Sequence, residues 1–169
     1  GKVSAGIAAA AASLGANDAA AVSAARGMMT TDTRPKLAGK TFAAAGSSYT
    51  VFGMAKGAAM IGPKLATMLG VVLVDAAIEP ADAQRLLVEA VEETFNCVSV
   101  DGHMSTNDTV LLLANGAAGG GTLHGAGLAA CGRALLEVCG TLARELADDG
   151  EGATHVMRIA VTGCASRDD

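Results

Sequence analysis

Two side chains within one glycine-rich stretch have chemistry that their neighbours do not explain. From Gly53 to Leu69 the sequence reads GMAKGAAMIGPKLATML, in which Lys56 sits among apolar residues and glycines. A buried ammonium group needs a charged or hydrogen-bonding partner, because its removal from water is costly. Thr67 follows the small Ala66 and opens a strongly apolar run. By composition alone, the stretch is a loop that leads into a buried strand.

The glycine-rich segments lack the common nucleotide-binding and hydrolase motifs. The run between Gly116 and Gly127 contains neither GxxxxGK[ST] nor a GxGxxG that opens a helix after a strand. No GxSxG nucleophile turn is present. We therefore interpret these glycines as turn residues and as points of close packing.

The cysteines and histidines do not have the spacing of metal ligands. The three histidines form no HExxH pattern and the four cysteines form no CxxC pair, so we expect no metal. We interpret the cysteines as small buried hydrophobic residues in a reducing compartment, with disulfides or metal ligation as the alternative. These residues are Cys97, Cys131, Cys139 and Cys164, with His103, His124 and His155.

Four motifs, in order along the chain, carry a specific resemblance. They are MTTDTRPKLA at 29–38, the 53–69 stretch, FNCVSVDGHMSTNDTVLLLANG at 95–116 and DGEGATHVMRIAVTG at 149–163. These segments resemble MTTDT, GMAKGSGMIxPNMATML, FNxxxVDGDTSTNDTxxLLAN and DGEGATKxxxxxVxG of the ornithine acetyltransferase family, the glutamate N-acetyltransferases of arginine biosynthesis. The four motifs together span nearly the whole chain.

The resemblance implies a self-processing enzyme whose nucleophile is an N-terminal threonine. The precursor would cut itself between Ala66 and Thr67, after attack of the Thr67 hydroxyl on the Ala66 carbonyl. The released amine, with a reference pKa of about 7.7–8.0, could then act as the base for its own hydroxyl. Thr67 would take acetyl from N-acetylornithine and pass it to glutamate. No cofactor is implied, and the use of acetyl-CoA as a substrate is left open.

The resemblance also implies the substrate site, the fold and the assembly. Thr30, Lys56, Thr67 and Glu151 would contact substrate, with Lys56 holding a carboxylate and Glu151 facing the ornithine amine. Asn107 and Asp108 are expected to brace the loop beside the site. The fold would be an α/β layered αββα-type sandwich, with 1–66 ending the α chain and 67–169 beginning the β chain of one domain. The processed halves would stay together as α2β2 in the cytoplasm.

Departures from the family pattern and the family's greater length leave other functions open. The motifs are altered at Lys64, Leu65, His103, Met104 and His155. The family's Thr-Gly oxyanion hole lies upstream of the matched segments, and a substrate-binding Asn and Ser/Thr lie downstream. The alternatives are therefore a truncated relative without catalysis and an N-terminal-nucleophile amidohydrolase.

Hydrophobic periodicity predicts alternating helices and strands. Helices are expected at 4–14, 17–29, 80–96 and 128–147, and strands at 48–53, 67–75, 109–114 and 155–163. The strands at 67–75 and 109–114 are expected to be buried. The segment 53–63 is expected to be a loop.

Composition favours a compact core of small residues and argues against two classes of partner. The 169 residues are 51% hydrophobic but only 2% aromatic, so the core must be built from aliphatic residues. The net charge of −5 and the lack of a basic run argue against nucleic acid. The best apolar run, Met68–Val74, is far shorter than the roughly 20 residues of a membrane span.

Overall fold

The computed structural model describes residues 1–62, 65–103 and 105–166, without the side chains of Leu65 and Ala66. Lys64 and Met104, two of the departures from the family motifs, therefore lie outside the described residues. The elements are α1 (Lys2–Ala12), α2 (Asp18–Met28), β1 (Lys36–Ala44), β2 (Ser47–Lys56), β3 (Ile61–Gly62), β4 (Leu65–Ala66), β5 (Leu69–Val74), α3 (Pro80–Glu93), a 3-10 turn (Phe95–Cys97), β6 (Thr109–Ala114) and α4 (Gly125–Asp148).

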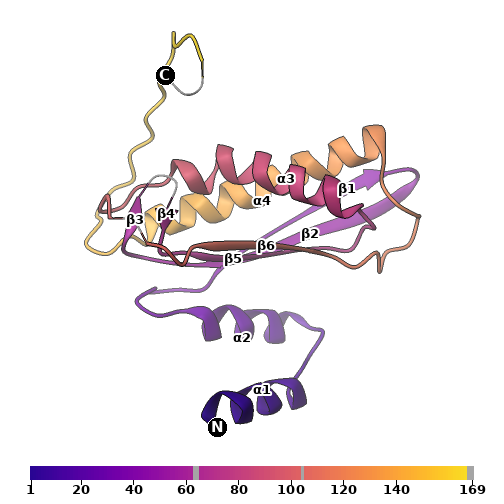
Figure 1. Ribbon diagram of the computed structural model, residues 1–169, viewed down its shortest axis with the longest axis horizontal. Coiled ribbons are helices and arrows are strands. Elements are labelled where there is room, and N and C mark those ends of the chain that lie inside the picture. Colours follow the sequence, from indigo (N-terminus) through magenta and orange to yellow (C-terminus); the bar gives the residue numbers. More distant parts are fainter. Residues whose placement is uncertain (63–64, 104, 167–169) are drawn as a thin grey trace.

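The main sheet has four strands in the order β1-β2-β5-β6 (Figure 1). β1, β2 and β5 are antiparallel neighbours, and β6 runs parallel to β5. The parallel pair requires a crossover, which α3 supplies. Strands from both sides of the predicted cleavage point, β2 and β5, are therefore hydrogen-bonded to each other in one sheet.

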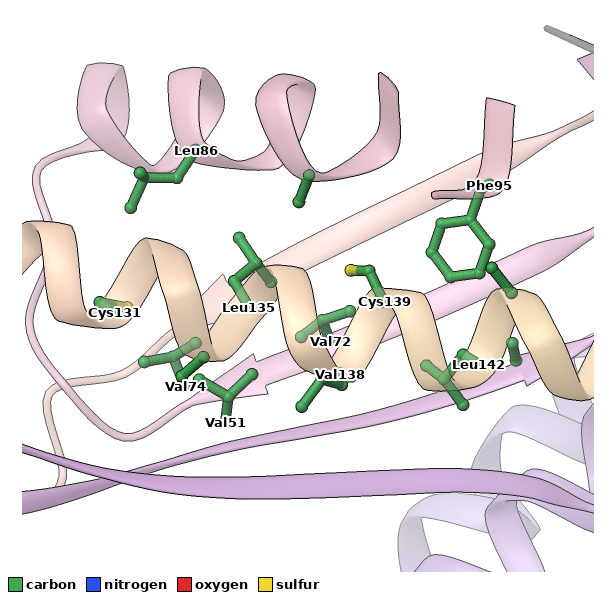
Figure 2. Close-up of a cluster of buried hydrophobic side chains, with 14 of the residues drawn as sticks. Val51, Val72, Val74, Leu86, Phe95, Cys131, Leu135, Val138, Cys139 and Leu142 are labelled. Carbon is green, nitrogen blue, oxygen red and sulfur yellow. The ribbon is translucent and has the colours of Figure 1, made fainter. Parts of the chain in front are cut away.

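α3 and α4 cover one face of this sheet and bury the core against it (Figures 1 and 2). Alternate residues of the central strands point toward α4, among them Val51 on β2 and Val72 on β5, both fully buried. A Cβ at Gly53 would come within 2.9 Å of the Leu142 and Val138 side chains, so the glycine allows α4 to lie close to β2. Each buried aliphatic side chain contributes roughly 1.5–3 kcal/mol of transfer free energy.

α4 is also long and apolar enough to cross a membrane, by length and composition. In this fold it is instead the central helix of the core, because nine of its residues are buried against the sheet and α3. They are Leu128, Cys131, Ala134, Leu135, Val138, Cys139, Leu142, Ala143 and Leu146.

The opposite face of the sheet is only partly covered. α2 lies on this side and buries Ala25, while α1 has no buried residue. Leu73 of β5 and Leu111 and Leu113 of β6 remain 38–54% exposed on the open face. Large exposed apolar faces are rare in soluble domains and mark surfaces that contact other structure.

The α/β class and most predicted elements are confirmed, but several details were wrong. Residues 155–163 were predicted to be a strand and are instead exposed, irregular chain. Val156, Ile159 and Val161 follow the strand pattern only in part, and a strand also needs a neighbour to pair with. The 109–114 segment is a strand but not a buried one, because β6 is at the edge of the sheet and has one open face.

Two further expectations are corrected, and the first of them concerns Lys56. β2 extends through Lys56, so this lysine ends a strand and does not lie in a loop. Cys131 and Cys139 are buried as expected, and burial raises the pKa of their thiols to about 11 and about 12. Cys97 and Cys164 are exposed, which corrects the expectation that all four cysteines are buried.

Candidate active site

All four sequence motifs meet at one end of the main sheet. In the strand register, Lys56 at the end of β2 pairs with Leu69 at the start of β5, which pairs with Thr109 at the start of β6. Thr67 lies two residues before the start of β5, and Asp108 directly precedes β6. The end of α4 reaches the same end of the sheet, because a Cβ at Gly57 would lie 3.4 Å from the Leu146 side chain. Segments up to about 120 residues apart in sequence therefore share one site.

Thr67 follows a short hairpin that presents the Ala66–Thr67 bond. β3 and β4 pair Ile61 with Ala66, and the Thr67 N–H continues this ladder by donating to the Met60 carbonyl at 2.7 Å. Asp101 anchors the first arm of the hairpin by accepting the amides of Met60 and Ile61 at 2.8 and 3.2 Å. These backbone hydrogen bonds hold the pKa of Asp101 below its usual value. The Thr67 hydroxyl itself is buried and has no hydrogen-bond partner among the described residues.

Lys56 is a nearly buried cation that faces Thr30. Its side chain is on the sheet face opposite α4, the residue is only 8% exposed, and Nζ donates to the Thr30 hydroxyl at 3.3 Å. Within the described residues, no carboxylate lies within ion-pair distance of Lys56. The exposed Thr30 hydroxyl is therefore a weak partner for a charge that costs free energy to bury. An anionic ligand group is the kind of partner this lysine lacks.

A buried cluster of charges ties the segments around the site together. Lys36 Nζ contacts Asp32 Oδ1 at 2.7 Å and Asp149 Oδ2 at 2.6 Å, with the three side chains at most 2% exposed. Asp32 also accepts the Gly57 amide at 2.6 Å and the Thr30 amide at 3.1 Å. The cluster therefore joins the residue after Lys56, the loop of Thr30 and the end of α4.

The two carboxylates of the cluster stay ionised in spite of their burial. Burial alone would raise the pKa of Asp32, but the hydrogen bonds from Gly57, Lys36 and Thr30 outweigh it and lower the pKa. Burial opposes the ionised form of Asp149 as well, and hydrogen bonds from Lys36 and Thr33 again leave its pKa below the usual value. Hydrogen bonds and a nearby cation favour the charged form of a carboxyl group.

Glu151 reaches the site through its backbone, while its side chain is exposed. The Glu151 amide donates to the Ala58 carbonyl at 2.7 Å, two residues beyond Lys56 in the loop that follows β2. Arg34 pairs with Asp148 at 2.6 Å in the same region. A solvent-facing carboxylate at this point is available to a cationic ligand group that approaches from outside.

Asp108 braces the backbone beside Thr67, as the sequence suggested. Its Oδ1 accepts the Met68 amide at 3.0 Å, and its Oδ2 is buried without a partner among the described residues. Burial raises the pKa of Asp108 above its usual value, although the Met68 hydrogen bond and the charge of Lys56 partly offset the effect. Asn107 is exposed, and its amide donates to Ser105 Oγ at 3.3 Å within the same loop.

The structure brings Thr30, Lys56, Thr67 and the Glu151 backbone to one region, but residues that connect them were not singled out from the sequence. Lys36, Asp32 and Asp149 were missed, although both aspartates lie inside the MTTDT and DGEGAT motifs. Nothing local marks Lys36 as buried, because its partners are 4 and 113 residues away.

Comparison with known proteins decides the family. The ArgJ family matches residues 1–169. This chain belongs to the ArgJ family. An arginine biosynthesis bifunctional protein ArgJ from Nitratidesulfovibrio vulgaris is 56% identical over 139 residues, which is 82% of this chain. The protein of the same name from Symbiobacterium thermophilum is 46% identical over 173 residues, or 99% of this chain.

This ArgJ-family chain matches only part of those relatives. It spans 35% of the Nitratidesulfovibrio vulgaris protein and 42% of the Symbiobacterium thermophilum protein. A crystal structure of the ArgJ protein of Bacillus halodurans matches 50% of this chain and 40% of that one, with 42% identity and a TM-score of 0.48.

Proposed function

We propose that this chain carries the nucleophile and part of the substrate site of a self-processed acetyltransferase that moves acetyl from N-acetylornithine to glutamate. Its membership in the ArgJ family supports a role in arginine biosynthesis. The observation that carries the proposal is the placement of Thr67 beside Lys56. Among the described residues, a buried hydroxyl without a hydrogen-bond partner and a buried ammonium without an ion pair lie at the same end of the main sheet.

The side chains at this edge suit the two substrates. Both N-acetylornithine and glutamate carry an α-carboxylate, and Lys56 with the Thr30 hydroxyl offers a charge-assisted site for it. The ornithine side chain ends in a cation, which the exposed Glu151 carboxylate can attract. The Thr67 hydroxyl would form an acetyl ester and release ornithine, and glutamate would then accept the acetyl group.

Cleavage before Thr67 supplies the base for acetyl transfer. The Thr67 nitrogen is now an amide that donates to the Met60 carbonyl. Once the Ala66–Thr67 bond is cut, this nitrogen becomes an amine that can take the proton of its own hydroxyl. The Met60 carbonyl, held by Asp101 through the Met60 amide, would keep the amine in place.

The remaining parts of the active enzyme are proposals that rest on the family. An oxyanion hole and a further substrate-binding segment would come from the rest of the ArgJ length, in an α2β2 assembly. The exposed leucines of β5 and β6 offer that part of the protein an apolar surface. We expect no metal or other cofactor, a cytoplasmic location, and neither nucleic acid nor membrane as a partner.

The test uses a protein of full ArgJ length that contains this sequence, and it measures ornithine release from N-acetylornithine with and without glutamate. Transfer predicts that ornithine release from N-acetylornithine depends on glutamate and yields N-acetylglutamate. Release that is equally fast without glutamate would indicate an amidohydrolase, and no release would indicate a non-catalytic relative. Thr67→Ala should abolish both cleavage and transfer, whereas Thr41→Ala, an exposed threonine of β1, should leave both unchanged.

A further inference from the structure

The self-cleavage step needs a base that the acetyl-transfer step does not need. In acetyl transfer the Thr67 amine takes the hydroxyl proton, but before cleavage this nitrogen is an amide and carries no basic lone pair. Some other group must therefore accept the proton when the Thr67 hydroxyl attacks the Ala66 carbonyl. The following inference rests on the proposed cleavage between these two residues.

Two buried polar side-chain atoms lack hydrogen-bond partners in the described part of the chain, and both are at this position. They are the Thr67 hydroxyl oxygen and Asp108 Oδ2. Orphaned buried polar atoms are rare in folded proteins and call for an explanation. One of these two atoms can donate a proton and the other can accept one.

The fold holds the two residues next to each other. Asp108 Oδ1 accepts the amide of Met68, the residue that directly follows Thr67. Beyond these residues β5 and β6 run parallel, with Leu69 opposite Thr109, so the pairing of two strands maintains the arrangement. Asp108 Oδ1 is thus fixed by the amide of the residue that follows the nucleophile. Asp108 Oδ2 remains without a hydrogen-bond partner among the described residues.

We propose that Asp108 is the catalytic base of self-cleavage. Its Oδ2 takes the proton from the Thr67 hydroxyl while the hydroxyl oxygen forms a bond to the Ala66 carbonyl carbon. Asp108 then returns this proton to the Thr67 nitrogen as the carbon–nitrogen bond breaks, which leaves an ester and a free amine. Water hydrolyses the ester, giving the Ala66 carboxylate and restoring the Thr67 hydroxyl.

The surroundings of Asp108 are consistent with this role. A general base works best when its pKa approaches the working pH, and burial moves the pKa of Asp108 in that direction. Asp101, in the preceding loop, does not compete for the role, because backbone amides occupy its oxygens and lower its pKa.

The experiment follows cleavage of the full-length precursor by intact mass. Asp108→Asn keeps an oxygen that can accept the Met68 amide but removes the base, and cleavage should slow by about 100-fold or more. Asp75→Asn is the matched control. Asp75 is also half-buried and accepts a backbone amide, that of Thr50 at 2.7 Å, but it follows the opposite end of β5. This control should cleave at the parent rate.

A Thr67→Cys background distinguishes a proton-accepting role of Asp108 from a purely structural one. Thr67→Cys supplies a thiol that ionises with a pKa near 8.5 and needs little help from a base. In that background Asp108→Asn should slow cleavage by less than about tenfold. If Asp108→Asn loses the circular dichroism of the parent, Asp108→Ser, which also lacks a carboxylate, replaces it, and the same contrast between threonine and cysteine is expected.

The outcomes distinguish this inference from the proposed function. A parent precursor that stays uncut overturns self-cleavage and the base together. A parent that cuts, with Asp108→Asn cutting equally fast, overturns only the role of Asp108. Equal slowing in the threonine and cysteine backgrounds also overturns the base, because the carboxylate would then act only on the position of the backbone.

Discussion

Removal of the Lys36 charge should destabilise the fold far more than removal of a neighbouring lysine charge. Lys36 and Lys40 lie four residues apart on β1, and each forms an ion pair with at least one carboxylate. Lys36 is fully buried and pairs with Asp32 and Asp149, whereas the Lys40 pair with Glu137 is 46% and 57% exposed. The substitutions Lys36→Met and Lys40→Met remove the same charge from the same strand in two different environments.

The expected magnitudes follow from burial. Loss of one partner of a buried ion pair leaves an uncompensated charge and costs about 3–5 kcal/mol, while an exposed pair is worth about 0–1 kcal/mol. Lys36→Met leaves the buried Asp32 without its cation and leaves Asp149 only the longer, 3.7 Å contact with the partly exposed Arg34, so we expect a loss of at least about 3 kcal/mol. With total stabilities of about 5–15 kcal/mol, this is a large fraction of the free energy of unfolding.

Urea unfolding followed by circular dichroism at the helical band is the suitable assay, because the chain has no tryptophan. At a slope of about 2 kcal/mol per molar urea, Lys36→Met should lower the midpoint by about 1.5 M or more. Lys40→Met should lower it by less than about 0.5 M. Equal midpoints for the two variants would refute the argument that the buried cluster holds the site segments together. Asp149→Asn should cost less in the Lys36→Met background than in the parent, since the two residues share one interaction.

Three further predictions concern pH and substrate. Asp32 and Asp149 have lowered pKa values in the folded state, so their stabilisation is present above the unfolded value of about 3.9 and is lost as the pH falls through the folded values. The urea concentration at the unfolding midpoint should therefore fall as the pH is lowered below about 4, and it should fall less steeply in Asp149→Asn. An equally steep pH dependence in Asp149→Asn would contradict the assignment. Lys56→Ala should lower kcat/KM for N-acetylornithine by about 10- to 100-fold, the effect of losing a charge-assisted hydrogen bond, while cleavage persists; an unchanged kcat/KM would remove its binding role. Acetyl transfer should rise with an apparent pKa of about 7–8 as the Thr67 amine loses its proton, and a rate that is flat from pH 6 to 9 would argue against the amine as base where acetyl transfer limits turnover.

Local sequence signals were reliable where a segment's structure depends mainly on its own residues. Pro80 at the first turn of α3 and the 3.6-residue apolar period of α4 predicted helices that the structure contains. The strand signal at 155–163 failed because a β-strand is completed by hydrogen bonds to a neighbour, and alternation within one segment cannot supply that neighbour. The same limit applies to β6, whose burial depends on what covers each face of the sheet.

The sequence by itself determined the family and the order of its motifs, and with them Thr67, Lys56, Thr30 and Glu151 as candidates. Only the tertiary structure decided how these motifs meet. The register that aligns Lys56, Leu69 and Thr109 depends on the pairing of three strands. The ion pair between Lys36 and Asp149 joins residues 113 positions apart. Such contacts leave no local pattern, because whether a charge is buried, and beside which partner, depends on how distant elements pack.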